Sequence, residues 1–427
     1  MSDHPLVIVG GGAAGLMAAI AAGEAGAGDG VLLLERSRDG GRKILISGGG
    51  RCNVLPSELD PRRYVTASSP NVMRRLLRSW PLAEQRRWFE ETLGIPLRLE
   101  PETGKLFPVS NRARDVRDAL VDRARALGAE LRFESSLERL EPLEPAAGRR
   151  HGWRLGLADG THLRARAVVL ATGGLSVPAT GSDGTGLRLL ELLGHRVNPL
   201  YPALAPLTAD PPVHAELAGV SLEVTLHGRH DGERREERGG FLFTHRGYSG
   251  PAVMNLSHLV ALARASGHAP GEGAELEVRW THESREVWDA RLRALESGPV
   301  GSELRRCLPQ RLADRLMAEA GVDPQTPASR LTREGRAALA RALGAWTLPW
   351  AGDEGYRKAE VTGGGVDLAE VDPRTLESRR RAGLFLCGEL LDAFGPIGGY
   401  NFAWAWATGR MAGRAAAAAG ARADLRE

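Results

Sequence analysis

The feature that most constrains this sequence is a glycine-rich turn near its start. Residues 6–9 are apolar and predict a buried strand, and residues 13–25 have the pattern of a helix. Between them, Gly10, Gly12 and Gly15 have the G-x-G-x-x-G spacing of a dinucleotide-binding turn. The first glycine permits the tight turn, the second lets the backbone approach a pyrophosphate, and the third lets helix and strand pack closely. The turn therefore predicts a nucleotide site at the start of an α/β sheet.

The residues that follow favour a bound nucleotide over a glycine-rich turn that binds nothing. Residues 31–34 predict a second strand that ends on Glu35, about 20 residues after Gly15. A carboxylate at that point can accept hydrogen bonds from a ribose, and it disfavours a 2′-phosphate. The amino end of the predicted helix offers free N–H groups and a positive dipole end to phosphates.

Composition narrows the class of protein. The chain has 427 residues, enough for two or three domains of ordinary size. Its 56 basic and 53 acidic residues give a net charge of +3, and this balance argues against a nucleic-acid partner. The first residues lack the features of a signal peptide or membrane span, so we expect a cytoplasmic protein with no membrane partner.

The three cysteines, Cys52, Cys307 and Cys387, are too few and too widely spaced for a disulfide framework. The sequence contains no C-x-x-C pair and therefore predicts neither a redox-active dithiol nor a zinc site. We expect a reducing compartment and no bound metal.

Glycines recur where further strands are predicted to end. These strands are residues 165–170, followed by Gly173 and Gly174; residues 358–362, followed by glycines 363–365; and residues 383–387, followed by Gly388. A mobile loop is expected at 40–53, with three consecutive glycines, and glycines 398 and 399 precede a helix predicted at 402–419. Because ligands of open α/β sheets bind at the carboxyl ends of strands, one ligand that reaches all these segments must be extended. This favours FAD over a mononucleotide. The sequence has no second G-x-G-x-x-G after a strand, so NAD(P)H is expected only as a transient co-substrate.

The middle of the chain has a different character. Five prolines between residues 199 and 212 mark a domain boundary. Strand patterns then predict a small antiparallel or barrel-like domain, with strands at 220–226, 237–244 and 275–280. Helical patterns follow at 287–295, 303–320 and 331–343 and predict a helical lobe. At the end of one apolar strand stands His245, close to Tyr248 and before a glycine and serine turn. A lone histidine is more often structural than catalytic, so both interpretations of His245 stay open.

Several segments together carry a family resemblance. The most specific are Ser-Gly-Gly-Gly-Arg-Cys-Asn at 47–53 and Thr-His-x-Gly-x-Ser-Gly-Pro at 244–251. The others lie at 7–15, 41–46, 106–110, 171–181, 388–392 and 398–401. With these segments the chain resembles the BaiN/YhiN-type family of NAD(P)/FAD-dependent oxidoreductases, a branch of the glutathione-reductase-like flavoproteins near the fumarate reductases. Residues 283–350 resemble that family only in their general character and contain none of these segments.

The resemblance implies an α/β fold with a Rossmann-like FAD-binding domain split between the N- and C-terminal parts. A β-rich, barrel-like domain that carries a helical lobe would interrupt it. The expected boundaries are 1–198 for the first part, 199–282 for the β-rich insertion, 283–350 for the helical lobe and 351–427 for the second part.

The resemblance also implies roles for individual residues. The ADP half of FAD would be held by Gly10, Gly12, Ala14, Gly15 and Glu35. The path from pyrophosphate to flavin would be lined by Arg42, Lys43, Ser47, Gly48 and Asn53. Thr172 and Gly173 would lie on the adenine and ribose side. The ribityl and ring end would be served by Gly388, Glu389, Asp392, Gly399 and Asn401.

The activity implied is reduction of the flavin by NAD(P)H, followed by hydride transfer through flavin N5 to an activated C=C bond of a small organic substrate. His245 or Tyr248 is the expected proton donor, because histidine can donate and accept protons near neutral pH. Two alternatives stay open. One is an FAD-dependent oxidase that uses O₂ on a small amine, and the other is a tRNA-associated flavoprotein without small-molecule turnover.

Overall fold

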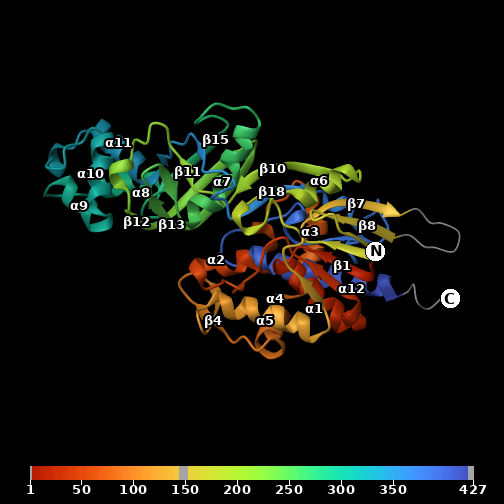
Figure 1. Cartoon of the computed structure of the whole chain (residues 1–427). Helices are drawn as coiled ribbons and strands as arrows, with labels where there is room; N and C mark the ends of the chain where they lie inside the picture. The colour runs from red at the N-terminus through yellow and green to blue at the C-terminus, as the bar shows by residue number, and fades with distance from the viewer. Residues whose placement is uncertain (1, 144–151, 422–427) are drawn as a thin grey trace. The chain divides into compact units, whose positions relative to one another are not determined.

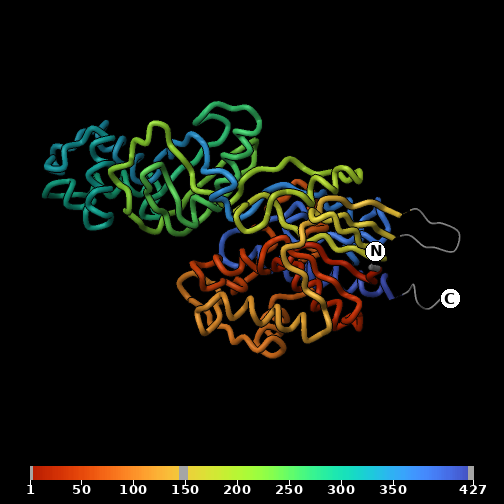
Figure 2. The backbone as a smooth tube through the Cα atoms, in the orientation of Figure 1, coloured from red at the N-terminus to blue at the C-terminus, as the bar shows by residue number. Residues whose placement is uncertain are grey.

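The computed structural model describes residues 2–143 and 152–421, and its chain divides into two compact units (Figures 1 and 2). The first unit contains Met1–Leu200 and Val361–Glu427, and the second contains Tyr201–Glu360. Each unit has its own cluster of buried apolar side chains. The second unit is thus inserted into the first along the chain.

A sheet of seven strands organises the first unit. Its parallel part runs in the order β6 (Glu130–Arg132), β2 (Val31–Leu34), β1 (Ser2–Val9), β9 (His162–Leu170) and β19 (Leu384–Leu386). An antiparallel pair, β8 (Gly152–Leu157) and β7 (Leu137–Leu143), continues from the amino half of β9. The four residues of β2 are all buried, as expected for a parallel strand covered on both faces. β19 comes from near the end of the chain, yet it pairs directly with β9.

Two helices from opposite ends of the chain pack side by side in this unit (Figure 1). α1 (Ala13–Ala22) follows β1, and α12 (Tyr400–Ala421) follows β19. A Cβ atom at Gly409 would overlap the carbonyl oxygen of Ala14, and one at Gly413 would overlap that of Ala18. The two helices therefore contact backbone to backbone, and glycine at these two positions of α12 is what allows it.

The remaining elements of the first unit surround this centre. A three-stranded sheet consists of β3 (Leu55–Pro56), β5 (Lys105–Pro108) and β4 (Leu97–Glu100). The helices are α2 (Arg42–Gly50), α3 (Pro70–Arg78), α4 (Leu82–Arg87), α5 (Ala113–Ala126) and α6 (Thr185–Leu192). β10 (Val197–Ala203) pairs with β18 (Val361–Val366), where the chain leaves and re-enters the unit.

The second unit is built on one antiparallel sheet. Its strand order is β16 (Trp346–Thr347), β15 (Ala274–Arg279), β12 (Ser221–His230), β13 (Glu233–Phe243), β14 (Gly247–Ser249), β11 (Leu207–Thr208) and β17 (Gly352–Asp353). α7 (Pro251–Ala265) packs on β12 and β13. The helical part contains α8 (Arg285–Arg293), α9 (Val300–Cys307), α10 (Gln310–Glu319) and α11 (Arg333–Gly344).

The sequence analysis predicts the split α/β domain and its β-rich insertion, and several details of the elements differ. The domain boundary expected after residue 350 falls instead after Glu360, because β17 pairs with β11 inside the second unit's sheet. The first boundary lies between Leu200 and Tyr201, two residues after the expected one. α7 is absent from the sequence predictions, which treated the start of this segment as a flexible turn. Proline stands at its first turn, where the missing N–H costs no intrahelical bond.

One predicted helix is divided in the structure. The helix predicted at 303–320 is two helices, α9 and α10, with Pro309 between them. Pro81 likewise separates α3 from α4, and a short π-helical turn follows α4 at Trp88–Thr92. Proline cannot continue a helix because its ring removes the N–H donor and clashes with the preceding turn.

Candidate functional site

The glycine turn at the amino end of α1 has the geometry that its spacing predicts. Gly10 has φ of +105°, and a Cβ atom there would overlap the carbonyl oxygen of Ala171. A Cβ atom at Gly15 would overlap the carbonyl oxygen of Gly10. Around Gly12 the result is the opposite, because no atom lies within 4 Å of the position its Cβ would take. Gly12 thus faces open space beside the uncapped amino end of α1, which suits a phosphate group.

Glu35 lies next to this turn, after β2. Its side chain is buried, and Oε2 accepts a hydrogen bond from the Gly11 amide at 2.7 Å. Oε1 accepts from the amide of Ser37 at 2.8 Å and from its hydroxyl at 2.6 Å. An ionised carboxylate has about four acceptor positions, so these three bonds orient Glu35 and leave acceptor capacity for a ribose hydroxyl.

The loop after β9 passes close to both segments. A Cβ atom at Gly181 would lie 3.6 Å from Glu35 Oε1. The hydroxyl of Thr172 is buried and has no hydrogen-bond partner among the described residues. It lies against Gly186, where a Cβ atom would overlap it. Thr172 thus lies beside the glycine turn, and Gly181 of the same loop lies beside Glu35.

A partly buried ion pair joins four segments that are far apart in the sequence. Lys43 Nζ lies 2.7 Å from Glu389 Oε2 and donates to Ser176 Oγ at 2.7 Å. The other carboxylate oxygen, Oε1, accepts from Ser176 Oγ at 2.8 Å and from the Thr362 amide at 2.9 Å. Thr362 Oγ1 in turn accepts from the amides of Leu175 and Ser176. We call Lys43, Ser176, Thr362 and Glu389 the clasp.

The charge of Glu389 is stabilised within the clasp. Burial alone would raise its pKa, but the Lys43 ammonium and the hydrogen bonds from Lys43, Ser176 and Thr362 bring the pKa below its ordinary value. Sequence analysis named Lys43 and Glu389 and missed Ser176 and Thr362. Ser176 stands two positions after Gly174 and Thr362 directly before the glycines at 363–365, so both lie beside patterns already noted.

The clasp gives a prediction about stability. Removing one partner of a buried ion pair typically costs ~3–5 kcal/mol, and because Lys43 and Glu389 are partly exposed we expect about 2 kcal/mol for Lys43→Met. The measurement is urea unfolding of the full chain. Because the pKa of Glu389 is lowered in the folded state, the pair stabilises above the ordinary carboxyl pKa and this stabilisation is lost as pH falls through the folded-state pKa.

A matched control is Arg62→Met, since Arg62 pairs with Asp60 on the surface and is 87% exposed. Its unfolding midpoint should equal that of the unmodified chain. Glu389→Gln should weaken the acid dependence of stability, and in the double variant with Lys43→Met the two losses should not add. Additive losses would mean that the two side chains do not act as a pair.

The segment at 40–53 is ordered, so the expectation of a mobile loop there is wrong. α2 begins at Arg42, and its helical geometry ends at Ser47, where ψ is 148°. Gly48, Gly49 and Gly50 then have φ of +55°, +68° and +83°, a run of left-handed residues that closes when the Cys52 amide donates to Ser47. A Cβ atom at Gly49 would meet no atom within 4 Å. This turn is a second stretch of backbone with open space beside it, and it lies at the end of α2, the helix that carries Lys43 of the clasp.

Other predicted residues of this segment are engaged by the chain. Arg42 pairs with Asp39 at 3.1 Å and donates to the Ala179 carbonyl at 3.2 Å. The hydroxyl of Ser47 donates to Ile44, and a Cβ atom at Gly48 would lie 3.2 Å from the amide nitrogen of Asn53. Arg42 therefore extends toward the loop after β9, whereas Ser47, Gly48 and Asn53 shape the turn at 47–53.

The C-terminal residues fall into two groups. Gly388 lies against the amino end of α1, since its Cβ would be 2.7 Å from that of Ala14. Asp392 is buried and accepts hydrogen bonds from the amides of Ala67 and Ser68 and from the side chain of Asn198. Asp392 thus fixes the polypeptide around the site.

Gly399 and Asn401 are also engaged by the chain. A Cβ atom at Gly399 would lie 2.5 Å from the Leu55 carbonyl carbon, and the Asn401 amide pairs with both backbone groups of Gly395. These two residues hold the loop before α12.

The expectation that glycines 363–365 end a strand and open a ligand site is wrong. They lie inside β18, and all are buried. A Cβ atom at Gly364 would overlap the Pro199 carbonyl, and one at Gly365 would lie 2.7 Å from the Leu390 carbonyl. Close packing of neighbouring backbone accounts for these glycines, so the strand ends that converge are those at 10–15, 171–176 and 388–389.

The two predicted proton donors lie in the second unit and differ in their surroundings. His245 is exposed, in the turn between β13 and β14. Tyr248 is buried, its hydroxyl lies 2.8 Å from His214 Nδ1, and burial raises its pKa. His214 Nε2 lies 2.7 Å from Glu319. Burial would raise the pKa of Glu319, but hydrogen bonds from His214, Arg315 and Trp346 lower it to about 2. Tyr248 therefore belongs to a buried polar network of its own unit.

Among the described residues, no group of three or more histidine, cysteine, aspartate or glutamate side chains could hold a metal ion. Within the same residues, no helix combines the length and apolarity that crossing a membrane requires.

Comparison with known proteins places this geometry among relatives. The model of a family described as HI0933-like protein Rossmann domain matches residues 4–415. The chain is 33% identical over 418 residues to a ribosomal RNA dihydrouridine synthase of Escherichia coli, covering 96% of each chain. It is 34% identical over 420 residues to a 3-dehydro-bile acid delta(4,6)-reductase of Clostridium scindens, covering 96% of this chain and 98% of that protein. A ribosomal RNA dihydrouridine synthase of Haemophilus influenzae is 32% identical over 411 residues.

Among solved structures, a 3-ketosteroid delta1-dehydrogenase from Sterolibacterium denitrificans has a similar fold. The TM-score is 0.53 at 14% sequence identity, over 98% of this chain and 100% of that one.

Proposed function

The chain belongs to the HI0933-like Rossmann domain family and is a flavin-dependent oxidoreductase, and on this premise we propose that it uses NAD(P)H to reduce an activated C=C bond. The observation that carries the proposal is the glycine turn with open space at Gly12, joined to the C-terminal segments through Gly388 and the clasp. The names of the relatives support the reaction type. One is a reductase, and the others form dihydrouridine, a base in which a ring C=C bond beside a carbonyl is saturated.

The residues present fit FAD at the glycine turn. Gly12 leaves the backbone open, and the amino end of α1 would face the pyrophosphate. Glu35 has acceptor capacity for the ribose. Ala14, Gly173, Gly48 and Asn53 would line the cofactor between its adenine and flavin ends, with Ser47, Gly399 and Asn401 fixing the surrounding turns. When bound, FAD supplies a two-electron carrier between NAD(P)H and the substrate.

The protein's own contributions are position, charge and a proton. Lys43 holds a positive charge in the first turn of α2, and Glu389 compensates it, so the clasp orients the lysine and leaves neither charge unpaired. Reduction of a C=C bond also needs a proton on the second carbon. We propose His245 as its donor, because its side chain is exposed, whereas the Tyr248 hydroxyl is bonded to His214.

Two substrate classes are compatible with this reaction. A small organic molecule with a conjugated carbonyl is one, and a base of RNA is the other. The second is supported by two relatives named for a reaction on ribosomal RNA.

The experiment that tests the proposal is an anaerobic titration of the purified protein. We expect the visible spectrum of a bound flavin and its bleaching by NADH or NADPH, followed by reoxidation when an α,β-unsaturated ketone or a uridine-containing RNA is added. A protein without a flavin spectrum would overturn the proposal. Peroxide formation from an amine in air, with no bleaching by NAD(P)H, would favour the oxidase.

A further inference from the structure

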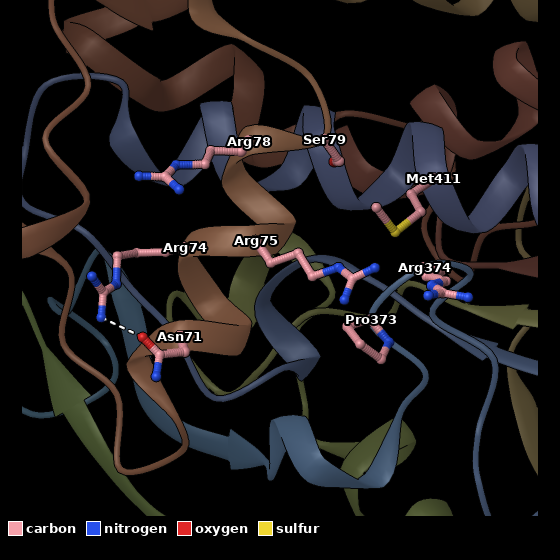
Figure 3. Close-up of a pocket in the computed structure, with 8 residues that line it drawn as sticks. All are labelled: Asn71, Arg74, Arg75, Arg78, Ser79, Pro373, Arg374 and Met411. Atoms are coloured by element: carbon pink, nitrogen blue, oxygen red, sulfur yellow. Dashed lines mark hydrogen bonds between the residues drawn. The ribbon is translucent and has the colours of Figure 1, made fainter.

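A basic groove lies on the first unit beside α3, with a volume of about 410 Å³ (Figure 3). Four arginines line it: Arg74, Arg75 and Arg78 from α3, and Arg374 from the segment before β19. All four are exposed. We call these residues the arginine groove.

The lining of the arginine groove is positive, and one carboxylate lies beside it, that of Asp372, whose Oδ1 accepts from the Arg374 backbone amide at 2.7 Å. None of its lining residues in the described chain is acidic, and the structure gives none of its four arginines an ion pair within residues 2–143 and 152–421. Arg74 is held by neutral acceptors, the Pro70 carbonyl at 3.1 Å and Asn71 Oδ1 at 2.6 Å. The Arg75 side chain extends from α3 toward Arg374 (Figure 3).

This arrangement is unfavourable without an anion. Arg74 and Arg78 are four residues apart on one helix, a spacing at which like charges destabilise the helix. The carboxyl end of α3 offsets part of this cost for Arg75 and Arg78, which lie in its last turn. Arg374 lies on another segment, so the helix dipole does not explain its position. A bound anion would relieve the repulsion among all four.

The groove fits phosphate groups along a chain better than a small nucleotide. One guanidinium group can bind two oxygens of a phosphate at once, and the four guanidinium groups of the groove lie along an open surface. The lining contains no aromatic side chain in the described residues, so a base would find nothing on which to stack. Contacts of this kind position a nucleic acid through its backbone and carry no sequence information.

We propose that the arginine groove binds RNA through its backbone phosphates. The inference rests on the proposed function for the choice of RNA as the polyanion. It departs from the expectation that there is no nucleic-acid partner. That expectation used the net charge of +3, which does not report how charge is distributed.

The test is binding of a fluorescein-labelled, uridine-containing RNA hairpin, followed by fluorescence anisotropy at several salt concentrations. The variant is Arg75→Ala/Arg78→Ala/Arg374→Ala in the full-length, flavin-loaded protein. We expect its dissociation constant to rise about tenfold or more, and the slope of log affinity against log salt to fall by about 2–3. Lysine at the same three positions should restore most of the affinity, because it keeps the charge.

The matched control is Arg330→Ala/Arg333→Ala, which removes exposed arginines from the second unit and should leave RNA affinity within about twofold. The proposal is overturned if wild type does not bind the hairpin, if the groove variant binds it as wild type does, or if inorganic phosphate binds in the groove as tightly as the hairpin does. Bleaching by NAD(P)H, measured on the same samples, reports the proposed function independently. Normal bleaching without RNA binding would overturn the proposal for the arginine groove and leave the proposed function standing.

Discussion

Gly15→Ala is expected to unfold the first unit or abolish FAD binding, whereas Gly12→Ala should weaken FAD binding and leave the fold intact. The reason is the space available to a methyl group. At Gly15 it would overlap the Gly10 carbonyl, so the strand and helix must separate, at a cost of about 3 kcal/mol or more. At Gly12 the backbone has φ of −78°, and no protein atom lies within 4 Å of the new carbon.

The Gly12 methyl group would instead enter the space that we assign to the pyrophosphate. Overpacking there should cost about 1–3 kcal/mol of binding energy, or ~10–100-fold in the dissociation constant of FAD. The measurements are thermal unfolding of the apoprotein and quenching of FAD fluorescence. Gly26→Ala is a control for glycine loss outside the site, since its Cβ also meets no atom within 4 Å and any change reflects its φ of +90° alone. Unchanged FAD affinity in Gly12→Ala would place the pyrophosphate elsewhere.

His245→Ala is expected to lower kcat by about 10²–10⁴, the usual contribution of a general acid. Reduction of the flavin by NAD(P)H should proceed at the normal rate, because that step needs no proton donor on the substrate side. Stopped-flow absorbance separates the two half-reactions. If the reduced His245→Ala enzyme also transfers hydride to substrate at the normal rate, this histidine is excluded as the proton donor.

Tyr248→Phe is the comparison that separates chemistry from structure. Its hydroxyl is buried and lies 2.8 Å from His214 Nδ1, so its loss leaves a buried ring nitrogen without a partner. We expect about 1–3 kcal/mol of lost stability and an unchanged kcat. A large loss of kcat with unchanged stability would transfer the proton-donor role to Tyr248.

The parts of the fold that sequence predicts best are those with a local physical cause. The residues of β2 form an uninterrupted apolar run, and the structure has this strand at the same bounds, Val31–Leu34. The G-x-G-x-x-G turn is local at Gly15, where a Cβ atom would overlap the Gly10 carbonyl of the same βα unit, whereas at Gly10 the close contact comes from Ala171, far along the chain. Both α10 and α11 keep their predicted helical character, since their apolar periodicity is independent of what they pack against.

The parts that sequence does not predict depend on partners far along the chain. A glycine run can open space for a ligand or let two backbones approach, and the run at 363–365 does the second because β10 and Leu390 lie against it. Ser176 and Thr362 carry no motif, and only the fold brings them to Glu389. The ordered turn at 47–53 shows the same limit. Three glycines predict mobility in isolation, but the hydrogen bond from Cys52 to Ser47 closes them into one conformation.

The contact between α1 and α12 has a consequence for the order of events during synthesis. Gly409 and Gly413 place the last helix directly on the backbone of the first, and β19 joins the sheet beside β9. While the chain emerges from the ribosome, the second unit is complete before either of these elements exists. We therefore expect the inserted unit to fold first and the cofactor to be captured only after α12 has been synthesised. Nascent chains stalled before α12 should resist protease only within the second unit.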